Sequence, residues 1–319
     1  MNHVRGQRST PPGEHRPVLL DEVLAALAPA PGGVFVDCTV GWAGHAVELL
    51  RRVGPAGRLV GIDFDPNNLP RARERLGALG YLFSLHHGNF AGLQNVLAAE
   101  GITAVDAVLA DLGMSSMQVD DAERGFSYVR DGPLDMRMDR SRGRTAAQLL
   151  ASISEDDLRQ ALRDLGDEPE AERIAAAIVR ARRSAPVERT ADLARAIREA
   201  TEGGADRPWR LHPRPGQWNL HPAARTFQVL RILVNRELAN LEQLLRVLPV
   251  VLRPGGRAAI ISFHSGEDRL VKAAFRDGLK AGTYADISPE PVRAGFAERT
   301  ANPRSRSAKM RWAIVSRRM

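Results

Sequence analysis

The chain has 319 residues, 44% of them hydrophobic and 26% charged, which is typical of a globular protein with a sizeable core. No apolar run approaches the ~20 residues that cross a bilayer, and residues 1–17 are polar and proline-rich, unlike a secretory signal. Cys38 is the single cysteine, which excludes an intrachain disulfide and a cysteine metal cluster. We therefore expect a cytoplasmic protein without a membrane span.

The net charge of +7 is concentrated at the end of the chain. Residues 299–319 contain seven basic residues and no acidic one, whereas the rest of the chain has 38 residues of each sign. A local basic excess of this kind suits a polyanionic partner. A solvated terminus that is kept soluble by its charge explains the same pattern equally well.

The first third of the chain alternates strand and helix patterns. Short apolar runs predict strands at residues 34–36, 59–62, 82–86 and 105–110, and helical periodicity predicts helices at 43–52, 67–76 and 91–100. This alternation implies right-handed βαβ units and a parallel sheet covered on both faces.

A helical insert follows Asp111. Three helical patterns lie near residues 154–166, 174–181 and 190–197, followed by a stretch rich in Gly, Pro, His and Trp over 203–222. One long helix is expected over 223–248, with strands at 257–263 and 309–316. We predict an α/β fold with a doubly wound, mainly parallel sheet built from residues 1–112 and 221–319, and a helical insert domain over 113–220.

Four features of the sequence fall where the predicted strands end, which is where an open parallel sheet binds its ligand. Asp37 ends the first strand and is followed by a turn whose glycines, Gly41 and Gly44, allow close approach to a ligand. The remaining three are Asp63 after the second strand, Gly88-Asn89-Phe90 after the third and Asp111 after the fourth. Asp63 is placed to accept both ribose hydroxyls, and Phe90 to flank an adenine.

Two kinds of nucleotide cofactor are compatible with this pattern. The segment from Gly41 to Gly44 lacks the full G-x-G-x-x-G fingerprint, and no pyrophosphate cradle is evident, which argues against a nicotinamide-dependent oxidoreductase. Carboxylates at three strand ends suit S-adenosylmethionine better, because that cofactor carries a sulfonium and an ammonium but no phosphate. A methyltransferase is therefore favoured.

The sequence closely resembles the bacterial small-subunit (16S) ribosomal RNA cytosine-N4 methyltransferases, the MraW/RsmH family. The resemblance covers essentially the whole chain. Its motifs are the segments at residues 15–22 (HRPVLLDE), 111–116 (DLGMSS), 123–127 (ERGFS), 131–139 (DGPLDMRMD), 225–228 (RTFQ) with Arg231-Ile232, 261–265 (ISFHS) and 302–307 (NPRSRS). The run from Asp131 to Asp139 is the most specific of them.

The resemblance implies a Rossmann-like class I methyltransferase that binds S-adenosylmethionine and methylates the N4 amine of a cytidine near the decoding centre of the small subunit. Carried over by position, the cofactor contacts are Ala43, Gly44, His45, Asp63, Phe90, Asp111 and Gln118. The family usually has Gly at position 43, Pro at 117 and Leu at 266, where this chain has Ala43, Met117 and Gly266. The methyl group of Ala43 is tolerable if its φ angle is negative.

Asp111 is the candidate catalytic residue. A hydrogen-bond acceptor held against the protons of the cytosine amine favours a pyramidal nitrogen aimed at the methyl group, and close alignment supplies much of the rate. A role limited to holding the cofactor is equally compatible with its position. His264 after the fifth strand is interpreted as a support of the site rather than as a base. His45 is interpreted as a cofactor contact, because no second ligand lies at metal spacing, so no metal is expected.

The partner implied by the resemblance is ribosomal RNA, within the ribosomal small subunit. A base reaches a buried methyl donor only by leaving its stack, so the helical insert is the expected wall of a base pocket. The candidate RNA contacts are Arg130, Arg137, Arg304 and Arg306. Trp209 and Trp218 are interpreted as loop-packing residues, with base stacking as the alternative. A homodimer and an RNA-binding module without catalysis both stay open.

Overall fold

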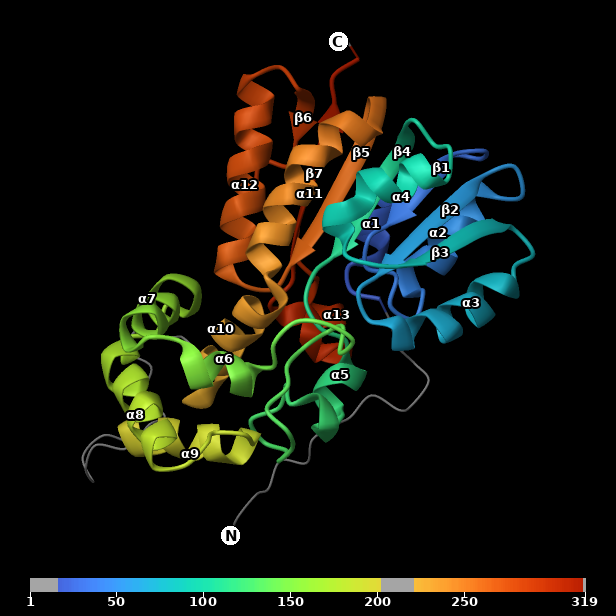
Figure 1. The fold of residues 1–319 in the computed structure, drawn as a ribbon. Helices are drawn as coiled ribbons and strands as arrows, with labels where there is room; N and C mark the ends of the chain where they lie inside the picture. Colours follow the sequence, from blue (N-terminus) through green and yellow to red (C-terminus); the bar gives the residue numbers. More distant parts are fainter. Residues whose placement is uncertain (1–16, 202–220, 318–319) are drawn as a thin grey trace. The chain divides into compact units, whose positions relative to one another are not determined.

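A computed structural model describes residues 17–201 and 221–317, and Figure 1 shows the course of the chain. The chain divides into two compact units. The first contains Met1–Gly113 and Leu241–Met319 and is called the sheet unit here; the second contains Met114–Asn240 and is called the helical unit. Trp209 and Trp218 lie outside the described residues.

The sheet unit is built on seven strands in the order β3-β2-β1-β4-β5-β7-β6. They are β1 (Val34–Asp37), β2 (Arg58–Asp63), β3 (Leu82–His87), β4 (Val105–Asp111), β5 (Leu252–Ser262), β6 (Tyr284–Ile287) and β7 (Lys309–Val315). Strands β1 to β5 pair in parallel, and β7 runs antiparallel to both β5 and β6. The expected doubly wound, mainly parallel sheet is confirmed, with β6 as an unexpected edge strand.

Helices cover both faces of this sheet. Alternate residues of a strand point to opposite faces, so Phe35 packs in one core cluster and Val36 in the other. The Phe35 cluster takes in α1 (Leu20–Leu27), α2 (Gly44–Val53) and α3 (Leu69–Gly77). The Val36 cluster takes in α4 (Leu93–Ala99), the part of α11 (Glu237–Val251) from Leu241 onward, and α12 (Ser265–Lys280). The result is a three-layer α/β/α arrangement, which Figure 1 shows for this unit.

The helical unit has its own hydrophobic core. Its elements are α5 (Ser116–Asp120), η3 (Ala122–Arg124), α6 (Ala146–Ser152), α7 (Glu155–Gly166), α8 (Ala171–Ser184), α9 (Thr190–Thr201) and α10 (Ala223–Asn235). Thr145 and Ser154 cap α6 and α7 by accepting hydrogen bonds from the amides of Gln148 and Asp157. Apolar faces at helical spacing, from Leu158, Ile174 and others, meet in one cluster.

The prediction of one long helix over 223–248 is wrong, because the helix is interrupted at Arg236. That residue adopts φ 53° and caps α10, and α11 starts at Glu237. No Gly or Pro marks the break. Phe227 and Leu230 of α10 pack in the core of the helical unit, so this unit extends to Asn240 rather than to residue 220.

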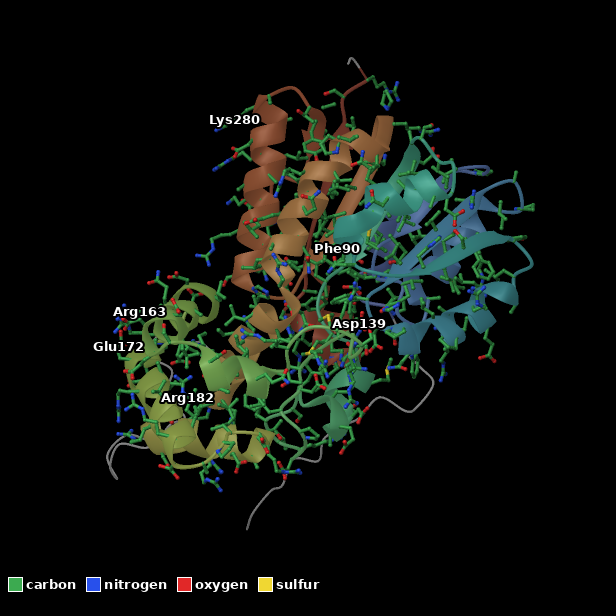
Figure 2. All side chains as sticks on the ribbon, viewed as in Figure 1. Phe90, Asp139, Arg163, Glu172, Arg182 and Lys280 are labelled. Atoms are coloured by element: carbon green, nitrogen blue, oxygen red, sulfur yellow. The ribbon has the colours of Figure 1, made fainter. Side chains whose placement is uncertain are left out.

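The loop between η3 and α6 is held by buried charges. The Arg124 side chain is 5% exposed and donates to the backbone oxygens of Arg137 and Met138. Asp139, labelled in Figure 2, is 2% exposed and accepts from Ser141 and Arg142. Such pairing is what allows charged groups to be buried in a loop.

Within the described ranges, no helix has the length and apolar character that a bilayer crossing requires.

Candidate active site

Three carboxyl groups stand at the ends of neighbouring strands of the sheet unit. Asp37, Asp63 and Asp111 are the last residues of β1, β2 and β4. Strand order reverses between β1 and β4, which is the point where open α/β sheets bind ligands. Thr39 connects the first and last of them: its amide donates to Asp37 Oδ1 at 3.1 Å, and its hydroxyl accepts from the Asp111 amide at 2.7 Å.

Asp63 holds the turn that follows β1. Its Oδ2 accepts from the Gly41 amide at 2.7 Å, and its Oδ1 accepts from the Asp65 amide at 2.8 Å and from Asn68 Nδ2 at 3.1 Å. Burial nevertheless raises the pKa of Asp63 above its usual value, although these hydrogen bonds lower it. The carboxyl group therefore organises the Gly41 turn in addition to any ligand that it binds.

The pKa values of the other two carboxyls are raised as well. Burial raises the pKa of Asp37 to about 7, helped by the charge of Asp63 and opposed by the hydrogen bonds from Thr39. Burial raises the pKa of Asp111 to about 8, with Asp37 and Glu267 adding to the rise and Arg304 opposing it. Carboxyls with raised pKa values gathered at a strand-end site are typical of functional centres.

Asp111 has an unused acceptor. Its side chain is 25% exposed, yet its Oδ1 atom is buried and has no hydrogen-bond partner among the described residues. A buried acceptor without a partner costs free energy, on the order of 1–3 kcal/mol. A cationic or hydrogen-bond-donating ligand would offset that cost, so the geometry fits a ligand that carries positive charge here.

Ala43 has a backbone conformation that is unfavourable for any residue with a Cβ atom. Its φ is 61° and its ψ 34°, and its amide donates to the Val40 carbonyl at 2.6 Å as the turn closes before α2. The expectation that the methyl group is tolerated through a negative φ is therefore wrong. A left-handed conformation costs ~1–2 kcal/mol for an L-residue, and glycine would adopt it freely.

We expect Ala43→Gly to change the free energy of unfolding much less than Ala46→Gly does. Both alanines are fully buried, so each variant loses one buried methyl group, worth ~0.8 kcal/mol. At Ala46, within α2, glycine also costs ~1 kcal/mol in helix propensity. At Ala43 the relief of strain offsets the loss, and urea unfolding should separate the two variants by ~2–3 kcal/mol. Equal losses would contradict strain at Ala43.

His45 lies between the first residues of the described chain and Asp111. It is 6% exposed; its Nε2 is 2.9 Å from the Val18 carbonyl oxygen, and its Nδ1 is 3.8 Å from Asp111 Oδ2. Gly44 beside it is also close-packed, because a Cβ there would lie 3.3 Å from Pro17 Cβ. The sequence predicted His45 as a cofactor contact but gave no sign of Val18 as its hydrogen-bond partner.

Phe90 follows β3 at the same edge of the sheet. It opens the short 3-10 helix η2 (Phe90–Gly92), which Asn89 caps by accepting from the Ala91 amide at 2.8 Å. The ring is half-buried against the core cluster of Val36 (Figure 2). The structure thus fixes the backbone of Phe90 and leaves part of its ring accessible.

Gln118 belongs to the helical unit. It forms a capping box at the start of α5, in which its Oε1 accepts from the Ser115 amide at 3.0 Å and its own amide donates to Ser115 Oγ at 3.3 Å. This hydrogen-bonded pair accounts for the local structure of the Ser115–Gln118 segment. A cofactor contact by Gln118 stays a prediction.

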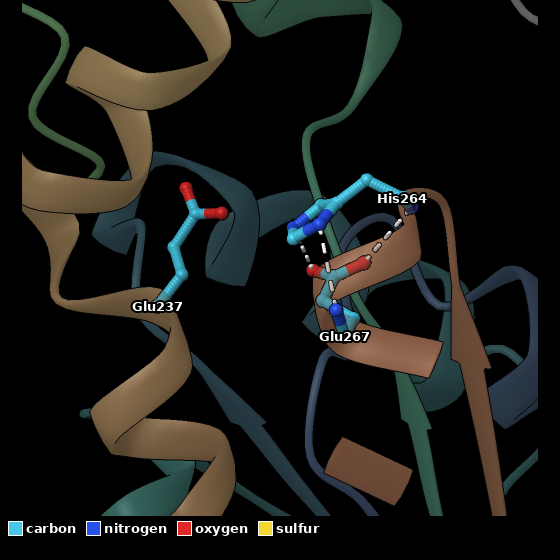
Figure 3. Close-up of side chains that lie close together, drawn as sticks. All are labelled: Glu237, His264 and Glu267. Carbon is cyan, nitrogen blue, oxygen red and sulfur yellow. Dashed lines mark hydrogen bonds and ion pairs between the residues drawn. The ribbon is translucent and has the colours of Figure 1, made fainter. Parts of the chain in front are cut away.

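His264 supports the start of α12. Its Nδ1 accepts from the Glu267 amide at 3.4 Å (Figure 3). Glu267 Oε2 accepts from the Phe263 amide at 2.9 Å. His264 Nε2 also lies 3.3 Å from Glu267 Oε1. Glu237, drawn in the same figure, pairs with Arg231 of the helical unit at 2.8 Å. The arrangement favours the interpretation of His264 as a structural cap.

The four arginines expected to contact RNA differ in their surroundings. Arg137 makes a bidentate pair with the buried Asp135, at 2.7 and 3.0 Å, and is 19% exposed. Arg130 is 48% exposed and pairs with Asp120 at 3.2 Å. Arg304 and Arg306 lie in η4 (Pro303–Arg306), where Arg304 is half-buried and Arg306 exposed. The Arg137 side chain is thus paired within its own loop. The positive charge of Arg304 acts on Asp111 and lowers its pKa.

The fold and the strand-end carboxyl groups define a Rossmann-like class I methyltransferase fold with a helical insertion. A family model described as "MraW methylase family" matches residues 13–316. The protein belongs to this family.

Its relatives match over nearly their whole lengths. A protein from Symbiobacterium thermophilum named "Ribosomal RNA small subunit methyltransferase H" is 47% identical, with 94% of this chain and 96% of the relative covered. A protein of the same name from Geobacter sulfurreducens is 46% identical, with 94% and 98% covered. Among solved structures, a putative rRNA methylase from Clostridium thermocellum aligns at 12% identity and a TM-score of 0.42, with 93% and 94% covered, too distant for a functional comparison.

Proposed function

We propose that this protein transfers a methyl group from S-adenosylmethionine to the exocyclic N4 amine of a cytidine in small-subunit ribosomal RNA, near the decoding centre. Membership of the MraW methylase family and the names of its relatives support the methyltransferase class and the RNA. The observation that carries the proposal is the buried, unpartnered Oδ1 of Asp111 at the end of β4. Our proposal locates the reaction in the cytoplasm, on the ribosomal small subunit.

The residues of the sheet unit suit this cofactor. S-adenosylmethionine supplies a methyl group on a positively charged sulfur, and it also carries an ammonium group. Buried carboxyls that resist ionisation without a cation are the groups expected to receive such charges. In our assignment, Asp63 holds the ribose, Phe90 flanks the adenine, and the backbone of Ala43, Gly44 and His45 lines the amino-acid end. Gln118 is assigned as a further cofactor contact.

Asp111 is assigned to the methyl-accepting amine. The lone pair of this amine is delocalised into the cytosine ring, so a neutral cytidine is a poor nucleophile. A carboxylate oxygen that accepts a hydrogen bond from the amine aligns the nitrogen and takes up part of the charge that develops on it. The ionised form of Asp111 stabilises this charge better than the protonated form, whose carbonyl oxygen still accepts a hydrogen bond but carries no negative charge. The positive charge of the bound cofactor favours the ionised form.

We expect the two arginines of η4 to have separable effects on methylation. Arg306 is exposed, so Arg306→Ala should weaken RNA binding and flatten its log–log salt dependence by about 0.7 per lost phosphate contact. Arg304 lowers the pKa of Asp111, so Arg304→Ala should shift the rise of activity to higher pH. Filter binding over a salt series and rate–pH profiles measure these effects. Identical behaviour of both variants would contradict this division.

The decisive experiment for the activity uses small subunits from cells that lack this protein. Incubation with the purified protein and S-adenosylmethionine should add one methyl group, which nucleoside mass spectrometry would identify as N4-methylated cytidine. Asp111→Ala serves as the inactive control. A methyl group on another atom would refute the assigned position, and the absence of any new methyl group would refute the activity.

A further inference from the structure

The backbone before α1 fixes the orientation of the His45 ring. Leu19 adopts φ 56° and ψ 36°, and its amide donates to Glu298 Oε1 of α13 (Phe296–Ala301) at 2.9 Å. Val18 and Leu19 are both buried, at 4% and 0% exposure. The carbonyl of Val18 is therefore held in place, and it lies 2.9 Å from His45 Nε2.

This contact settles which ring nitrogen of His45 carries the hydrogen. A carbonyl oxygen can only accept, so Nε2 must donate to Val18. In the neutral ring, Nδ1 then carries the lone pair. Nδ1 lies 3.8 Å from Asp111 Oδ2, an ion-pair separation. His45 thus presents a proton acceptor to the carboxyl group at the end of β4.

The other charged groups that act on Asp111 come from three elements. They are Asp37 at the end of β1, Glu267 in α12 and Arg304 in η4. Burial is the main cause that raises the pKa of Asp111 to about 8; the two carboxyls add to the rise, and Arg304 opposes it. Glu267 is engaged with the Phe263 amide, and Asp37 with the Thr39 amide. His45 is the neighbour that becomes positively charged, rather than less negative, when it takes up a proton.

We propose that His45 is a positioning residue that takes up the proton of Asp111 when the cofactor binds, and then holds the carboxylate as its ion-pair partner. One proton passes from the Asp111 carboxyl group to His45 Nδ1 through one bridging water, because Nδ1 and Asp111 Oδ2 are 3.8 Å apart. One O–H bond of Asp111 breaks, one N–H bond of His45 forms, and the total charge of the pair stays constant. The proposal rests on the proposed function, because the ionised Asp111 is the acceptor for the amine. The inference on His45 adds that Asp111 ionises inside the site, without release of its proton to bulk water.

Proton counting by calorimetry tests this transfer. S-adenosylmethionine is titrated into the protein at pH 7 in two buffers with different heats of ionisation, which gives the number of protons released. His45→Gln keeps a donor for the Val18 carbonyl but cannot take up a proton, so it should release up to about one proton more than the parent. His86→Gln is the matched control, since His86 lies on β3 and contacts Glu100 at 2.6 Å. It should release the same number as the parent.

Two further readouts separate proton uptake from a purely structural role. In the parent at pH 7, the nuclear magnetic resonance signal of the His45 ring should change from the neutral to the charged form when S-adenosylmethionine is added. In His45→Gln, kcat/KM should fall about tenfold at pH 7 and recover towards the parent value at pH 9, where Asp111 ionises unaided. The resonance measurement uses the unmodified protein, so it stands even if the variant fails to fold.

The outcomes distinguish this inference from the proposed function. A parent that binds no S-adenosylmethionine overturns both. A parent that binds it and methylates RNA while the His45 ring stays neutral overturns only the proton transfer. The proton transfer alone is also overturned if His45→Gln releases the parental number of protons and loses activity equally at every pH.

Discussion

Replacing Asp63 with alanine should lower the affinity for S-adenosylmethionine by at least about 100-fold and also lower the melting temperature. Two charge-assisted hydrogen bonds to the ribose would be worth ~1.5–3 kcal/mol each. The same carboxyl group accepts from the amides of Gly41 and Asp65 and from the Asn68 side chain, and these contacts are lost too. The sequence alone predicted only the contact of Asp63 with the ribose. Calorimetry and thermal unfolding measure the two losses separately.

Asp106→Ala provides the matched control for the effect on stability. Asp106 accepts from the Val34 amide at 2.8 Å and pairs with Arg253, at the beginning of β1 rather than at its end. This variant should lose stability while its cofactor affinity stays at the parental value. If Asp63→Ala lost stability but bound the cofactor normally, Asp63 would be a structural residue only.

Removal of the carboxyl group of Asp111 should produce opposite effects on activity and stability. Asp111→Ala should lower turnover by about 10²–10⁴-fold, the range for loss of a group that handles the reacting proton. Asp111→Asn, which keeps one acceptor oxygen, should lose less. Both should lower turnover more than they weaken cofactor binding if Asp111 orients the amine. Equal losses in turnover and affinity would assign Asp111 to cofactor binding alone.

The stability effect of Asp111→Asn should depend on pH. The pKa of Asp111 is about 8 in the fold and 3.8 as an ordinary side chain, so the folded state retains a proton that the unfolded state releases. Stability from this group is present below pH 4 and is lost as pH rises to about 8. The melting temperature of the ligand-free variant should therefore exceed that of the parent increasingly from pH 5 to pH 9. A difference independent of pH would contradict an Asp111 that is protonated in the fold.

The strand-end positions were predictable from sequence because they follow from a local pattern. Buried apolar runs such as that before Asp111 specify strands, and parallel strands bring their last residues to one edge of the sheet. Asp37, Asp63 and Asp111 were found in this way, and the structure brings them to one edge of the sheet unit. The Gly-rich turn and Phe90 followed from the same reasoning.

Other features depend on contacts that no local pattern shows. The positive φ of Ala43 and of Arg236 appears at residues that rarely adopt it, so tertiary packing overrides local preference. The sequence predicted Arg137 as an RNA contact. Its hydrogen bond to Asp135 depends on the conformation of the loop, which the sequence pattern does not show. The contact of His45 with Val18 and the charge of Arg304 near Asp111 join residues that are far apart in the sequence.

The contact between the Leu19 amide and Glu298 has a consequence for the synthesis of the protein. It joins residues 279 positions apart, so the turn that orients His45 is incomplete until Glu298 has been made. Strand β5 is also late, because 140 residues separate Asp111 from Leu252. At about 5–20 residues per second, translation inserts a delay on the order of ten seconds between β4 and β5. We expect the nascent chain to emerge with an unfinished sheet, and the active site to form only after β5 and α13 have been made.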